Sequence, residues 1–83
     1  MTPRVILYHQ PGCPPCHWVM DFLTNHRISY ESKDVREDAA ALKELVALGS
    51  QSTPTLVIDG EVLIGFEPDR ILSLLGKKPP NRR

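Results

Sequence analysis

Two cysteines separated by two prolines, in the segment Gly12–His17 (GCPPCH), most restrict how this chain can fold. They are the only cysteines, and they closely follow an apolar run, Arg4 to Tyr8, that predicts a buried strand. Beyond them, helical spacing relates Val19, Phe22, Leu23 and His26. The pair is therefore predicted to lie where a strand ends and a helix begins.

The rest of the chain predicts three more strands and two more helices. Strands are expected at 28–33, 55–58 and 62–64, with Asp59-Gly60 as the tight turn between the last two. One helix is expected to start in the acidic segment 34–38 and stop at Gly49, and another to run from Pro68 to Gly76. The predicted order is β-α-β-α-β-β-α, an α/β fold with a mixed four-stranded sheet flanked by helices.

Length and charge restrict the class of protein. A chain of 83 residues predicts one domain, here 1–76, followed by a basic and disordered tail, 77–83 (KKPPNRR). Residues 1–76 hold six basic and ten acidic residues, a net charge of −4, which argues against nucleic acid as the partner. No apolar run could span a membrane, and Val5–Leu7 is too short a core for a signal peptide. We therefore expect a cytoplasmic monomer.

The cysteine pair has two interpretations that involve a bound group. A structural zinc site needs about four ligands, usually as two pairs, and no second pair at ligand spacing accompanies the cysteines. The C-P-P-C-H pattern matches covalent haem attachment, but haem usually needs a second axial ligand, often methionine. Met20 lies one helical turn from His17 and hence on the same side of the iron. We expect no bound metal or cofactor.

The strand–helix junction favours thiol–disulfide chemistry. The start of a helix presents unpaired N–H groups and the positive end of the helix dipole, and both stabilise a thiolate. Cys13 is expected to be the more exposed thiol and to attack, and Cys16, one turn into the helix, to resolve the mixed disulfide. Two structural thiols that never react are the alternative.

Three motifs resemble the glutaredoxin branch of the thioredoxin superfamily. Residues 7–16 (LYHQPGCPPC) are similar to its strand and C-P-x-C motif, residues 52–55 (STPT) to its cis-proline segment, and residues 58–71 (IDGEVLIGFEPDRI) to its hairpin, glycine turn and last helix. The resemblance covers nearly the whole chain except the tail. It implies a thioredoxin-like fold of glutaredoxin type and a dithiol oxidoreductase that reduces protein or small-molecule disulfides. A redox-sensing or thiol-dependent binding module without turnover is the alternative.

The resemblance implies two alternative electron donors. Glutaredoxins that use glutathione usually carry Lys or Arg where this chain has Gln10, and Gly-Gly where it has Ile64-Gly65. The segment Gly65–Asp69 (GFEPD) is instead similar to the small redoxins that serve ribonucleotide reductase and are reduced by thioredoxin reductase. Pro14-Pro15 departs from those redoxins. Glutathione and thioredoxin reductase, with NADPH acting indirectly, therefore both stay open as the reductant.

Substrate contacts are expected around the cysteines, before the cis proline and in the glycine turn. Pro54 is expected to follow a cis bond, which leaves the Thr53 backbone facing outward to pair with an extended substrate. Phe66 is expected to form an apolar wall or a partner contact, and Glu67 to accept an amino group or to cap the last helix. The expected substrate-binding residues are Gln10, Pro11, Gly12, Pro14, Pro15, Ser52, Thr53, Pro54, Gly65, Phe66 and Glu67.

The second proline of the motif predicts how strongly the site reduces. Pro15 has no N–H, so the nearest backbone donor left for the Cys13 thiolate is the N–H of Cys16. A less stabilised thiolate makes the dithiol couple more reducing, nearer the thioredoxin value of about −270 mV than the glutaredoxin range of about −200 to −230 mV.

Overall fold

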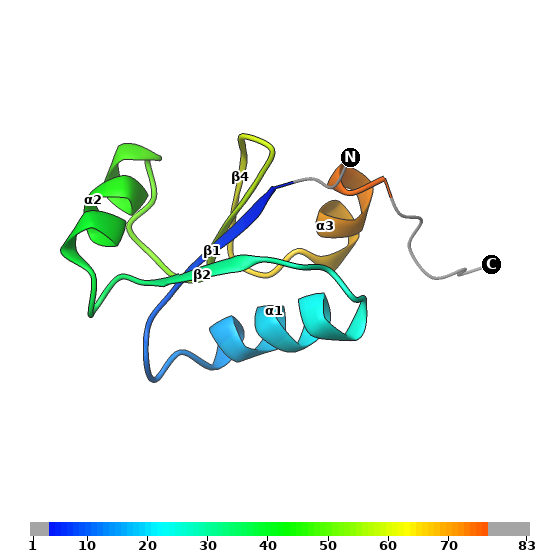
Figure 1. The fold of residues 1–83 in the computed structure, drawn as a ribbon, viewed down its shortest axis with the longest axis horizontal. Helices are drawn as coiled ribbons and strands as arrows, with labels where there is room; N and C mark the ends of the chain where they lie inside the picture. The colour runs from blue at the N-terminus through cyan, green and yellow to red at the C-terminus, as the bar shows by residue number, and fades with distance from the viewer. Residues whose placement is uncertain (1–3, 77–83) are drawn as a thin grey trace.

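A mixed four-stranded sheet in the order β2-β1-β3-β4 organises the chain (Figure 1). The computed structural model describes residues 4–76, so the predicted tail lies outside the described residues. The elements, in chain order, are β1 Val5–His9, α1 Pro14–Asn25, β2 Glu31–Asp34, α2 Ala39–Ala47, β3 Thr55–Ile58, β4 Glu61–Ile64 and α3 Pro68–Leu74. This is the element order and the α/β architecture that the sequence predicts.

The central strand β1 pairs in two directions. It runs parallel to β2, from Ile6 opposite Glu31 to His9 opposite Asp34. It runs antiparallel to β3, with Leu7 opposite Leu56, and β3 forms the predicted hairpin with β4. The helical crossover thus makes β1 and β2 parallel, and the end of β1 delivers the chain to the start of α1.

Alternate residues of β1 face two separate core clusters, because side chains of a strand alternate between the faces of a sheet. The larger cluster packs α1 and α3 against one face of the sheet; its buried members are Val5, Leu7, Val19, Leu23, Leu56, Ile58, Leu63 and Ile71. The smaller cluster packs α2 against the other face, and its buried members are Tyr8, Val35, Ala41 and Leu45. Tyr8, the last residue of the run predicted as a buried strand, is therefore a core residue.

The second strand was predicted too early. The predicted range is 28–33, but β2 spans Glu31–Asp34. Ile28 and Tyr30 lie before the strand and pack, half-buried, against the larger core cluster. Their alternation thus reflects packing of a loop onto the core, whereas the pairing of β2 is set by the register of β1.

Other element ends differ by one or a few residues. β1 ends at His9 rather than Tyr8, and β4 begins at Glu61. The segment 34–38 precedes α2, and Asp38 caps the helix by accepting from the N–H groups of Ala40 and Ala41 at 2.9 and 3.3 Å. The two later helices end before the predicted glycines, α2 at Ala47 and α3 at Leu74. Among residues 4–76, no helix is long and apolar enough to cross a membrane.

Candidate active site

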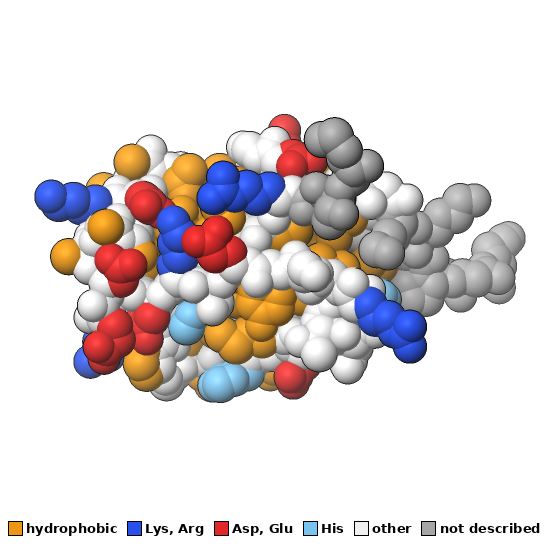
Figure 2. Space-filling view, in the orientation of Figure 1, with side chains coloured by type: hydrophobic (Ala, Val, Ile, Leu, Met, Phe, Trp, Pro, Cys, Tyr) orange, Lys and Arg blue, Asp and Glu red, His pale blue; other side chains and the backbone are white. Residues whose placement is uncertain are grey.

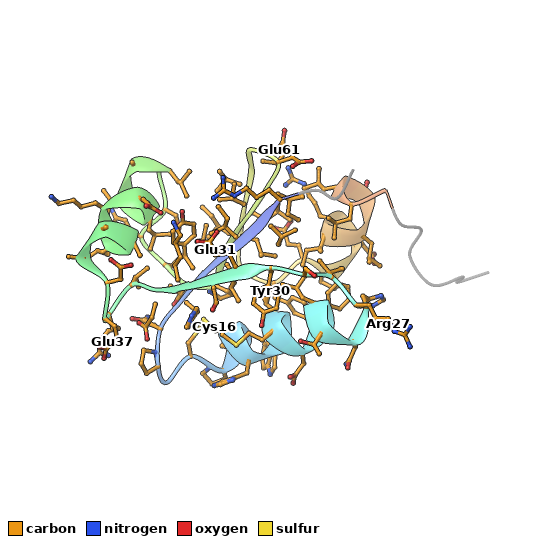
Figure 3. The ribbon with its side chains drawn as sticks, viewed as in Figure 1. Cys16, Arg27, Tyr30, Glu31, Glu37 and Glu61 are labelled. Atoms are coloured by element: carbon orange, nitrogen blue, oxygen red, sulfur yellow. A yellow bond between two sulfur atoms is a disulfide. The ribbon has the colours of Figure 1, made fainter. Side chains whose placement is uncertain are left out.

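The two cysteines meet at the start of α1 and form a disulfide, Cys13–Cys16. Figure 3 shows Cys16 in the first turn of α1, next to the loop that leaves β1. Cys13 is 8 % exposed and Cys16 is 2 % exposed, so both are largely covered and Cys13 is the more accessible, as predicted. Their separate roles in attack and resolution stay a prediction.

Cys13 is the N-cap residue of α1, with Pro14 and Pro15 at the first two helical positions. Its Sγ accepts a hydrogen bond from the backbone N–H of Cys16 at 3.3 Å. This is the donor that the sequence predicts for a motif in which the second proline lacks an N–H. The helix start therefore aims a backbone donor and its dipole at Cys13.

A second donor approaches Cys13 from the segment before β3. The Thr53 hydroxyl donates to Cys13 Sγ at 3.6 Å, a normal length for a bond to the larger sulfur atom. Gln10, in the loop after β1, donates from Nε2 to Thr53 Oγ1 at 3.1 Å. The sequence predicted Gln10 and Thr53 as substrate contacts but not the hydrogen bonds that link them to Cys13. The one sequence feature that could have indicated these bonds is a hydroxyl residue directly before the expected cis proline.

The Thr53–Pro54 peptide bond is cis, as predicted. Pro54 is buried, and its carbonyl oxygen accepts from the Gly65 N–H at 2.8 Å, which ties the glycine turn to the cis-proline segment. Gly65 has a φ of 90°, a left-handed conformation that glycine adopts without strain. These contacts bring Gly65 next to Pro54.

Buried hydroxyl groups fix the loop that carries Thr53. The Oγ atoms of Ser50 and Thr55 lie 2.8 Å apart, and Thr55 Oγ1 donates to the Ser52 carbonyl at 2.7 Å. Ser50 also accepts from the Ser52 N–H at 3.3 Å. Because Ser50 and Thr55 are almost fully buried, this network holds the loop in one conformation. No pattern in the sequence predicted this network of hydroxyl groups.

The glycine-turn residues predicted beyond Gly65 lie in other surroundings. Phe66 packs edge-on against Phe22 of α1, with ring centroids 5.6 Å apart, and so contributes to the larger core cluster. Glu67 occupies the N-cap position of α3, but its side chain makes no capping hydrogen bond there and lies 3.8 Å from Arg70. The expectation of a side-chain cap was therefore wrong for Glu67.

The surface around the cysteines carries few charged groups. Pro11, Gly12, Pro14 and His17 are exposed, and Trp18 is 55 % exposed on the first turns of α1. Figure 2 shows acidic and basic side chains crowded at the α2 end of the molecule, while the part over α1 is mostly hydrophobic or uncharged. Within 4–76, no three His, Cys, Asp or Glu residues are grouped as metal ligands.

Charged groups gather instead around Glu44 on α2. Its carboxylate accepts from the Tyr8 hydroxyl at 2.9 Å and from Lys33 Nζ at 2.8 Å. The hydrogen bond from Lys33 is the main cause that lowers the pKa of Glu44, followed by the hydrogen bond from Tyr8. The bond between Lys33 and Glu44 also raises the pKa of Lys33. Burial, followed by the bond to Glu44, raises the pKa of Tyr8. This cluster anchors α2 to the sheet and is separate from the cysteine site.

The glutaredoxin family model matches residues 5–63, a span that includes the cysteine pair and the cis proline. The chain belongs to the glutaredoxin family. The Cys13–Cys16 pair is consistent with thiol–disulfide redox activity, which is general in this family. The prediction of a glutaredoxin-like redoxin, made from the three motifs, is confirmed.

Sequence relatives of this glutaredoxin-family chain come from phages and bacteria. It is 34 % identical over 77 residues to the gene 56 protein of Mycobacterium phage D29, covering 90 % of this chain and 86 % of the relative. It is 31 % identical over 72 residues to an uncharacterized glutaredoxin-like 8.6 kDa protein of Clostridium pasteurianum, covering 86 % of this chain and 96 % of that one.

Solved structures share the whole fold. A mutant of the thioredoxin-like protein BC3987 has a TM-score of 0.87 and 45 % identity, over 90 % of this chain and 97 % of that one. The glutaredoxin-like NrdH-redoxin of Escherichia coli, described as having a thioredoxin-like activity profile, has a TM-score of 0.79 and 27 % identity, over 86 % of this chain and 93 % of that one. The predicted glutaredoxin-type fold is confirmed.

Proposed function

We propose that this chain is a dithiol oxidoreductase that reduces protein disulfides, with Cys13 as the nucleophile and Cys16 as the resolving thiol. The observation that carries the proposal is the pair of hydrogen bonds to Cys13 Sγ, from the Cys16 N–H and the Thr53 hydroxyl. Both bonds would strengthen when this sulfur is a thiolate, since charged acceptors form stronger hydrogen bonds. Cys16 Sγ receives no such pair from the described residues.

The proposed reaction moves two electrons. The Cys13 thiolate attacks one sulfur of the substrate disulfide, forms a mixed disulfide and releases the other substrate sulfur as a thiolate. Cys16 then loses its proton to that thiolate and attacks Cys13 Sγ. The second substrate sulfur leaves as a thiolate that takes a proton from water, and the Cys13–Cys16 disulfide closes. The substrate is reduced to two thiols and the chain is oxidised.

The cis-proline segment offers a place for an extended substrate. Thr53 is half-buried, and neither its backbone N–H nor its carbonyl is hydrogen-bonded to another residue within 4–76. Backbone groups that lack an internal partner can pair with an added strand. We propose that a substrate segment pairs with Thr53 and thereby presents its disulfide to Cys13.

A flavoprotein of the thioredoxin reductase class is the electron donor that we propose, with glutathione as the alternative. Gln10 is neutral where a basic residue would bind a glutathione carboxylate, and its amide is already bonded to Thr53. The likeness to NrdH-redoxin, which has a thioredoxin-like activity profile, supports the same choice.

The test combines turnover with trapping. NADPH oxidation is followed with a disulfide substrate and either thioredoxin reductase or glutathione plus glutathione reductase. We expect turnover with the first system, none with Cys13→Ser, and a stable mixed disulfide with Cys16→Ser.

Three results would contradict parts of the proposal. If Cys13→Ser forms the mixed disulfide and Cys16→Ser does not, the two roles are reversed. Turnover only in the system with glutathione and glutathione reductase would mean that glutathione is the electron donor. Trapping by Cys16→Ser without turnover in either system would favour the binding module.

A further inference from the structure

We propose that Gln10 is a positioning residue: its side-chain amide directs the Thr53 hydroxyl onto Cys13 Sγ, where that hydroxyl provides a donor that Pro15 cannot. Residues from two loops form this chain of hydrogen bonds, which runs from Gln10 in the β1–α1 loop to Thr53 in the loop before β3, and back to Cys13. The proposal rests on the proposed function only in taking Cys13 as the thiol whose ionisation matters.

The direction of the chain follows from the atoms involved. Gln10 Nε2 can only donate, so its 3.1 Å bond occupies a lone pair of Thr53 Oγ1. The single hydroxyl hydrogen of Thr53 is then left for Cys13 Sγ, 3.6 Å away. A group at position 10 that accepted instead would draw this hydrogen away from the sulfur.

The hydroxyl needs such a partner because nothing else fixes its rotation among the described residues. The other donor to Cys13, the Cys16 N–H, is fixed by the helix backbone. The Thr53 loop is braced by Ser50 and Thr55, but none of their hydrogen bonds involves Thr53 Oγ1. Gln10 is the residue that bonds to Thr53 Oγ1 and so selects the direction of its hydrogen.

The consequence concerns the reduced form. A thiolate accepts more strongly than a disulfide sulfur, so the correctly aimed hydroxyl stabilises the reduced, ionised Cys13 more than the oxidised pair. A position predicted to contact substrate would thereby also set the nucleophile's ionisation.

The test is a double-mutant cycle on the reduced full-length protein, read by the ultraviolet absorbance of the thiolate as pH is varied. Thr53→Val removes the hydroxyl but keeps the branched shape, and we expect it to raise the Cys13 pKa by about 1 unit, the size of one hydrogen bond to a charged group. Gln10→Leu should raise it by a smaller amount. In the Thr53→Val background, Gln10→Leu should produce no further shift, because the partner through which it acts is gone.

Two further variants separate direction from charge. Gln10→Glu presents only acceptors to Thr53 and should raise the pKa more than Gln10→Leu does; repeating it in the Thr53→Val background measures the effect of its charge alone. Thr53→Ser, which keeps a hydroxyl, should stay closer to the parent than Thr53→Val. Urea unfolding of each variant verifies that the fold is intact.

Equal shifts from Gln10→Leu in both backgrounds, or no shift in either, would overturn the proposal. The titration needs no disulfide substrate and no electron-donor enzyme, so failure of the proposed oxidoreductase activity would leave this result standing, and the reverse is also true.

Discussion

At the residue scale, the second proline of the motif removes a specific hydrogen bond. An N-cap side chain accepts from the N–H of the second or third helical residue. Here the cap is Cys13, the second helical residue is Pro15 and the third is Cys16, which makes the bond at 3.3 Å. The Thr53 hydroxyl supplies Cys13 Sγ with a second hydrogen bond in place of the one that the missing N–H would donate.

Restoring that N–H should change the redox potential. We expect Pro15→Ala to make the couple about 30 mV less negative, which corresponds to about 1.4 kcal/mol of extra stabilisation of the reduced form by one charge-assisted hydrogen bond. Equilibration with a glutathione or thioredoxin redox buffer measures the potential. Pro14→Ala is the matched control, because the N–H it restores lies at the first helical position, which does not face the cap. Equal shifts in both variants would contradict the donor argument.

Elements are held to the sheet by very different contacts. α1 and α3 are fixed by apolar packing, whereas α2 adds the polar anchor in which Glu44 accepts from Tyr8 and Lys33. The sequence predicted α2 from its apolar spacing but gave no indication of this anchor. The three residues belong to three elements and meet only after β1, β2 and α2 are assembled.

The anchor predicts a dependence of stability on pH. The pKa of Glu44 is lowered from its ordinary 4.5, so its contribution to the free energy of unfolding is present above that value and is lost as pH falls through the lowered pKa. The pKa values of Lys33 and Tyr8 are raised, so their contributions are present below about 10 and are lost as pH rises through the raised values. The effects are small, because water screens the exposed Glu44.

Urea unfolding at a series of pH values measures this dependence. In Glu44→Gln, we expect the free energy of unfolding to fall less steeply at acid pH, because the Glu44 contribution is gone. The loss of stability at alkaline pH, which comes from Lys33 and Tyr8, should also become smaller. Glu37→Gln is the control, since the Glu37 side chain points away from the fold in Figure 3. If the free energy of unfolding of Glu44→Gln falls with acid pH as steeply as that of the parent, the anchor does not contribute to stability.

The sequence could predict features with a local signature, but not the exact ends of elements or the contacts between residues far apart in the chain. The cysteine pair, the hairpin at Asp59-Gly60 and the cis proline have local signatures, and the structure bears all three out. The start of β2 depends on its pairing with β1, and the bond from Thr53 to Cys13 joins residues 40 positions apart. Such features arise from tertiary packing, which no local pattern encodes.

At the scale of the whole molecule, the two faces of the sheet differ in how completely they are enclosed. The larger cluster is covered by two helices and draws on three strands, while the smaller is covered by α2 alone. Leu42 and Val46 on α2 are exposed, so the outer side of this helix has no apolar cover within 4–76. α2 therefore has more freedom to shift toward a cavity than α1 does.

A matched pair of cavity substitutions tests this difference. Leu23 of α1 and Leu45 of α2 are both buried, and each loses the same atoms on substitution by Ala. We expect Leu23→Ala to reduce the free energy of unfolding by about 4–5 kcal/mol and Leu45→Ala by about 2–3 kcal/mol, because a site that can collapse loses less. For a chain of this length the total is only ~4–12 kcal/mol, so Leu23→Ala should leave a marginally stable protein. Urea unfolding gives both values, and a larger loss in Leu45→Ala would mean that the α2 face is the more rigid one.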